Sequence, residues 1–142
     1  MSPRACSLAL ALLCVAGCGG SSGIRIKDPW ARSSPAMASM GAAYLTITSA
    51  SDDRLIGVEV PASVAARAEI HEVVTDSTGA MRMQPVSGVD LPAGEPVTFR
   101  PGAWHVMLIG LARPLVPGAS FEMTLRLEHA APHTVRVPVR GR

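Results

Sequence analysis

Residues 121–128 read Phe121-Glu122-Met123-Thr124-Leu125-Arg126-Leu127-Glu128, with an apolar side chain at every second position. Because successive side chains of a β-strand point to opposite faces, this alternation predicts a strand with one buried face and one solvated face. Val135, Val137 and Val139 repeat the pattern, and the segment 129–133 between the two runs is typical of a hairpin connection. Together the two runs predict an antiparallel pair of strands.

The rest of the chain continues in the same manner. Thirteen glycines and twelve prolines among 142 residues argue against long helices and favour short strands joined by tight turns. Seven further strands are expected, at 24–30, 42–48, 55–60, 68–74, 81–86, 96–99 and 104–108. About nine short strands at this spacing predict a single all-β domain, an antiparallel β-sandwich of immunoglobulin-like type or a barrel.

Charge and aromatic content exclude several classes of partner. Thirteen basic and eleven acidic residues give a formal charge of +2, and the basic residues are scattered along the chain. This is not the concentrated positive charge of a nucleic-acid-binding protein, and so no nucleic acid is expected as a partner. Two Trp, one Tyr and two Phe are also too few for a platform on which bases or sugars stack.

The N-terminal residues are typical of a bacterial lipoprotein. Residues 1–17 have a basic start and a short apolar stretch, which predicts a signal peptide rather than a membrane span. Small residues precede Cys18, and 18–23 form a Gly/Ser-rich tether, so Cys18 is the expected lipidation site. The alternative is an ordinary secretory signal with a chance cysteine. The lipoprotein interpretation places a folded domain of residues 24–142 outside the inner membrane, anchored in the periplasm or cell envelope.

The cysteine count then limits the chemistry of that domain. Cys6 and Cys14 lie within the predicted signal peptide, and Cys18 is the lipidation candidate. Residues 24–142 therefore contain no thiol that could form a disulfide, bind a metal or act as a nucleophile.

Two histidines and two methionines form the pattern that carries chemistry. His71 is followed by eleven residues and Met83, then by twenty-one residues and His105, one residue and Met107. On a strand, His105 and Met107 share one face about 6.5–7 Å apart, so both can reach one ion. Each methionine alone is more often a core residue than a ligand, and only the combination indicates a metal site.

The donor types favour copper. Thioether sulfur is a soft ligand that suits Cu(I), and imidazole binds copper in either oxidation state. Two His and two Met form a neutral set that binds without deprotonating a thiol. Zinc would favour Cys, His or carboxylate ligands, and calcium would need an oxygen cage that the sequence does not show.

This spacing resembles the metal motif of the periplasmic CuA copper-chaperone family, PCuAC. The resemblance extends from about Asp28 to Val139, and its most specific blocks are residues 69–72, 81–86 and 105–111. It implies a cupredoxin-like β-sandwich in which His71, Met83, His105 and Met107 bind one Cu(I) per chain. Many members carry Met after the first His, whereas this chain has Glu72, which is not expected to ligate.

Three further residues stay open at this stage. Met81 is either a spare donor or a hydrophobic lid. His129 and His133 are either exposed residues of a hairpin connection or an auxiliary Cu(II) site.

Two classes of function remain. The first is a Cu(I) chaperone that delivers copper to the CuA subunit of cytochrome c oxidase or to a thiol-containing assembly factor, partners that the resemblance implies. The alternative is a lipoprotein module with a β-sandwich fold that binds a partner without metal. An electron-transfer cupredoxin is excluded because blue-copper sites need a cysteine. No catalytic pattern stands out, and so an enzyme is not expected.

Overall fold

The computed structural model describes residues 23–141, and this part of the chain contains no helix. The predicted signal peptide 1–17 and Cys18 lie outside the described residues, as does most of the tether. Among residues 23–141 there is accordingly no helix long and apolar enough to cross a membrane. The ten strands are β1 Ile24–Arg32, β2 Met40–Ser49, β3 Asp53–Glu59, β4 Ala65–Thr75, β5 Met81–Pro85, β6 Val89–Leu91, β7 Pro96–Phe99, β8 His105–Leu111, β9 Ser120–Leu127 and β10 His133–Arg140.

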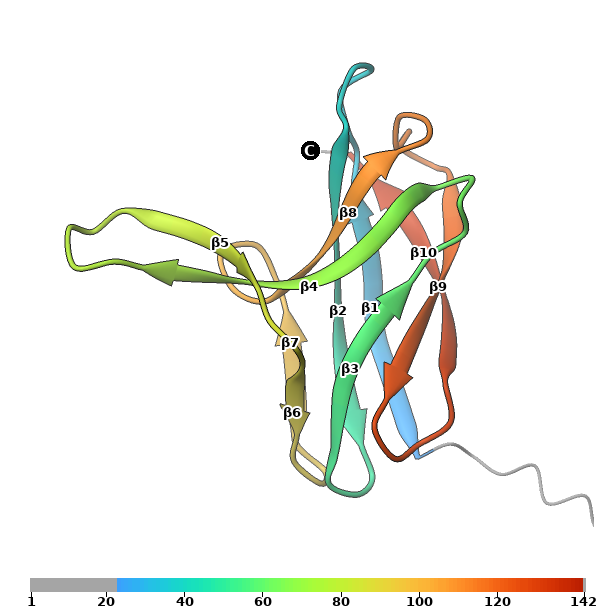
Figure 1. Cartoon of the computed structure of the whole chain (residues 1–142). Coiled ribbons are helices and arrows are strands. Elements are labelled where there is room, and N and C mark those ends of the chain that lie inside the picture. Colours follow the sequence, from blue (N-terminus) through green and yellow to red (C-terminus); the bar gives the residue numbers. More distant parts are fainter. Residues whose placement is uncertain (1–22, 142) are drawn as a thin grey trace, which may run out of the picture.

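The strands hydrogen-bond in the order β5-β4-β8-β2-β1-β10-β9-β3-β6, and β7 pairs with β2 (Figure 1). One half, from β5 to β1, packs on the other half, from β10 to β6, and side chains of both halves form one hydrophobic core. The halves are joined by β1 and β10, the one parallel pair among otherwise antiparallel pairs in the described residues. The all-β sandwich predicted from the sequence is confirmed.

The alternation in β9 and β10 has the predicted consequence. Met123 and Leu125 are fully buried, as is Val137 across the hairpin. Sequence patterning missed β6, which is only three residues long and therefore too short to show a period. It pairs with β3 and contributes Val89 and Leu91 to the core.

An irregularity in β1 decides which side chains reach the outer face. Ile24 and Ile26 face the core, but the pairing with β2 shifts between Lys27 and Trp30, where Asp28 has a φ of 49°. A bulge of this kind reverses the order of inward and outward residues. Ala31 is therefore buried, and Trp30 turns outward to lie against Tyr44, with ring centroids 4.6 Å apart.

The hairpin of β4 and β5 projects from the body of the sandwich (Figure 1). Its turn is fixed by Asp76, whose carboxylate accepts hydrogen bonds from the backbone N–H and the hydroxyl of Thr78 and from the N–H of Ala80. Gly79, with a φ of 86°, completes the turn because glycine tolerates the left-handed region. All five residues of β5 are exposed, and so this edge strand presents its side chains to solvent.

Candidate metal centre

The outer face of β4, β5 and β8 brings the motif residues together. His71 on β4 lies directly opposite His105 on β8. Met107 is two residues further along β8, and Met83 on β5 pairs with Val73, two residues along β4 from His71. Side chains two residues apart on a strand share a face. His105 is therefore the direct cross-strand neighbour of His71, and Met83 and Met107 are diagonal neighbours within reach of long side chains.

A carboxylate fixes the ring of His71. Its Nε2 lies 2.9 Å from Oε2 of Glu69, and the other oxygen of Glu69 accepts a 2.8 Å bond from Nε of Arg67. The hydrogen bond from His71, followed by that from Arg67, lowers the pKa of Glu69, which is therefore an ionised acceptor. Nε2 of His71 must then carry the proton. In a neutral ring this leaves a lone pair on Nδ1.

The ring of His105 is fixed by the backbone. Its Nδ1 lies 3.0 Å from the carbonyl oxygen of Ala103, which can only accept, so Nδ1 carries the proton. The lone pair of the neutral ring is then on Nε2. The turn that places this carbonyl includes Gly102, with a φ of 80°.

The two lone pairs are buried and unsatisfied. Within residues 23–141, Nδ1 of His71 and Nε2 of His105 are the two buried side-chain nitrogen or oxygen atoms without a hydrogen-bond partner. The ring centroids are 5.8 Å apart. Buried polar atoms nearly always have partners, and an exception calls for an explanation. A ligand that accepts electron pairs from both nitrogens supplies one.

Both motif methionines open onto solvent beside these rings. Met83, Met107 and His105 line a surface cavity of about 360 Å³. The side chain of His71 is only 12% exposed and lies outside that lining. The predicted set therefore consists of two nearly buried imidazoles, of which that of His105 lies in the cavity lining, and two thioethers.

Other candidates occupy different positions. Met81 is 66% exposed and lies outside the cavity lining, and its role as a spare donor or a hydrophobic lid stays a prediction. Glu72 accepts a 2.8 Å hydrogen bond from Gln84 on β5, on the face of β4 opposite to His71. Sequence reasoning missed Met40, which lines the same cavity from β2. The sequence gives no sign of it, because the pairing of β2 with β8 cannot be deduced from spacing.

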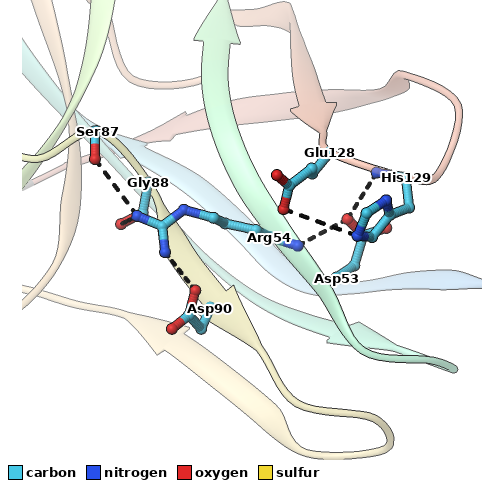
Figure 2. Close-up of polar contacts among 7 residues, drawn as sticks. All are labelled: Asp53, Arg54, Ser87, Gly88, Asp90, Glu128 and His129. Carbon is cyan, nitrogen blue, oxygen red and sulfur yellow. Dashed lines mark hydrogen bonds and ion pairs between the residues drawn. The ribbon is translucent and has the colours of Figure 1, made fainter.

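The histidines outside the motif lie at the hairpin of β9 and β10. His129 is in the connection, as expected, and lines a different cavity together with Asp53, Arg54 and Glu128. Its Nε2 is 3.8 Å from the carboxylate of Glu128 (Figure 2). His133 begins β10, opposite Leu125. The auxiliary Cu(II) site stays a prediction.

Asp53 holds this connection, and Figure 2 shows its hydrogen bonds with Arg54 and His129. Asp53, only 8% exposed, accepts hydrogen bonds from three backbone N–H groups, those of Arg54, His129 and Ala130, at 2.7, 3.0 and 2.9 Å. Burial acts to raise the pKa of Asp53, but the three donors outweigh it, and the pKa lies below its usual value. The adjacent Arg54 binds Asp90 and so joins β3 to β6.

Comparison with known proteins places the chain in a family. The family described as "LpqE-like: Putative lipoprotein LpqE-like" matches residues 24–139, which is nearly the whole sandwich. The chain belongs to the LpqE-like family. A curated protein of Leifsonia xyli subsp. xyli, named "Putative lipoprotein Lxx21020", is 29% identical to this LpqE-like chain over 96% of its length and 89% of the relative's.

Solved structures show which fold this LpqE-like domain shares. The apo PCuAC domain from PmoF1 has a TM-score of 0.71 at 23% identity and covers 84% of this chain and 95% of the other. The copper-bound PCuAC domain from PmoF2 has a TM-score of 0.67 at 27% identity, covering 84% and 94%. The LpqE-like chain therefore has the cupredoxin-like fold of PCuAC domains, which confirms that part of the resemblance found in the sequence.

Proposed function

We propose that this LpqE-like protein is an extracytoplasmic carrier of Cu(I), with one ion per chain held by His71, Met83, His105 and Met107. The ion is cargo that the protein receives and passes on, and no enzymatic activity is expected.

The observation that carries the proposal is the pair of buried, unsatisfied imidazole nitrogens. Glu69 and the carbonyl of Ala103 occupy the other nitrogen of each ring, and so both lone pairs are available without loss of a proton. Two thioethers on the same face add soft donors, a combination that favours Cu(I) over harder cations. A relative of the same fold is copper-bound, which supports the same cargo here.

The exposure of the ligands supports delivery rather than storage. Met83 is 59% exposed on the projecting β5, whereas His71 is nearly buried. An incoming ligand can displace the accessible thioether first while the imidazoles still hold the ion. The proposed acceptor is the CuA subunit of cytochrome c oxidase or a thiol-containing assembly factor, as the PCuAC resemblance implies.

We further propose that Cys18 is lipidated and anchors residues 24–142 to a membrane of the cell envelope. The support is the small-residue sequence before Cys18 and the name of the family. The substitution Cys18→Ser is expected to release the protein from the membrane fraction. A variant that stays in that fraction would contradict the anchor and leave the copper proposal untouched.

The decisive experiment is an anaerobic titration of residues 22–142 with Cu(I) in competition with a chromogenic chelator. This fragment contains the whole core of the described residues and the whole family match. Capture of one equivalent is expected. A fragment that folds but never competes with the chelator would favour the second candidate, a metal-free binding module on the same sandwich.

A further inference from the structure

The cavity contains a third thioether that the motif does not include. Six methionines lie within the described residues. Met123 is in the core, whereas Met37 and Met81 are exposed outside the cavity lining. Of these six methionines, only Met40, Met83 and Met107 line the cavity, which His105 also lines. Exposure alone therefore does not select Met40.

The strand register places Met40 beside the motif. On the pair β2–β8, Met107 lies opposite Ala42, and Met40 lies opposite Ile109. Met40 and Met107 are thus diagonal cross-strand neighbours on the outer face. The Cα atoms of such neighbours are about 7–8 Å apart, which is within reach of long side chains. Ala42, directly opposite Met107, carries only a methyl group. Methionine is flexible enough to reach over so small a neighbour.

The methionines that line the cavity come from strands at different positions in the sheet. Met83 is on β5, the edge strand of the projecting hairpin, whereas Met40 is on β2, in the interior of the sheet. His105 and Met107 are on β8, between β4 and β2. An ion bound at His105 and Met107 therefore has one thioether on each flank. Met40 is 54% exposed and lines the cavity, and so its side chain is accessible from solvent.

We propose that Met40 is an exchange ligand of the copper site. Its thioether sulfur binds Cu(I) as the bond to the sulfur of Met83 breaks, and the ion stays bound to His71, His105 and Met107. The copper remains Cu(I), no proton moves, and one sulfur–copper bond replaces another. Since both sulfurs are neutral, the exchange changes no charge, and Met83 becomes free on the side from which an acceptor approaches. This inference rests on the proposed copper function.

The first test follows the methionine methyl groups by NMR. Residues 22–142, labelled with ¹³C at the methionine methyls, are titrated with Cu(I) without oxygen. Shifts are expected for Met83, Met107 and Met40, with Met37 and Met123 unchanged as internal controls. If Met83 and Met107 shift and Met40 does not, the role of Met40 is overturned and the copper function stands. If none of the three shifts, the copper function itself fails.

The second test separates a ligand from a bystander whose signal moves because the ion is near. Met40→Leu keeps an apolar side chain of similar volume but removes the sulfur. The copper-loaded variant is expected to release Cu(I) to the chelator about tenfold more slowly. Without the sulfur of Met40, the transition state for release loses one weak ligand, and its free energy rises accordingly. Equilibrium affinity should change much less. Met37→Leu is the matched control, and an unaltered release rate in Met40→Leu would refute the exchange.

Discussion

Buried polar side chains at two places in the sandwich differ in how fully they are hydrogen-bonded. At the hairpin of β9 and β10, Asp53 has three backbone donors for its carboxylate. On the outer face of β4 and β8, His71 and His105 each have one nitrogen bound and one nitrogen buried without a partner.

The difference distinguishes a side chain that stabilises the fold, Asp53, from the two side chains that we propose bind a ligand, His71 and His105. The hydrogen bonds of a fully bonded carboxylate offset the desolvation free energy of its burial. An orphaned lone pair has no such hydrogen bond, so the fold carries a cost that only a bound species removes. Both orphaned atoms belong to neighbouring rings and lie beside two thioethers, and this is the observation on which the proposed copper site rests.

The largest effect, on Cu(I) affinity, is expected from removing two of the candidate copper ligands. The double substitution of His105 and Met107 by Ala should weaken Cu(I) binding by about a thousandfold or more, since two of four ligands are lost. The free energy of unfolding should fall by about 1 kcal/mol, because the hydrogen bond between Nδ1 of His105 and the carbonyl oxygen of Ala103 is lost. Chelator competition and urea denaturation measure the two quantities. Affinity that survives would place the ligands elsewhere in the chain.

A substitution of Asp53 tests the region in which the buried polar group is fully hydrogen-bonded. Asp53→Ala leaves three backbone N–H groups without their acceptor, and the free energy of unfolding should fall by about 3 kcal/mol. Copper affinity of the folded variant should be unchanged. Glu95→Ala, a substitution of an exposed carboxylate, is the matched control for denaturation. A variant that binds copper poorly while fully folded would contradict the separation of the two regions.

A smaller effect is expected from the residue that positions His71. Glu69→Ala removes the acceptor at Nε2, so the ring samples both tautomers, and Cu(I) affinity should fall about tenfold. The ¹⁵N shifts of the copper-free ring report the tautomer directly. Glu72→Ala is the control, because that carboxylate bonds Gln84 on the other face. Identical ring shifts in wild type and Glu69→Ala would show that Glu69 does not orient the ring.

The sequence predicted these two regions unequally. Alternation identified β9 and β10, and the spacing of His71, Met83, His105 and Met107 placed the candidate ligands on three strands that are indeed neighbours. Which strands would pair could not be predicted, because pairing depends on contacts far apart in the chain. The bulge at Asp28, the parallel pairing of β1 with β10, the position of Met40 and the role of Asp53 all follow from such contacts.

The smallest effect is expected on the pH dependence of the free energy of unfolding, to which Asp53 contributes. The pKa of Asp53 is lower in the folded protein than its ordinary value near 4, because three backbone donors stabilise the carboxylate. A depressed pKa means that the stabilisation is fully present above the unfolded value and is lost as pH falls toward the folded value. Asp53→Asn cannot titrate, and its amide places an NH₂ group among donors that need an acceptor.

The stability gap between wild type and Asp53→Asn should therefore be constant above about pH 5 and shrink below about pH 4. Subtracting the variant cancels the other carboxylates with lowered pKa values, Asp28, Glu69 and Asp76, which both proteins share. Urea denaturation from pH 2.5 to 6 measures the gap. A gap independent of pH would mean that the charge of Asp53 does not matter and that only its shape holds the hairpin. The comparison with the histidines would then rest on hydrogen-bond geometry alone.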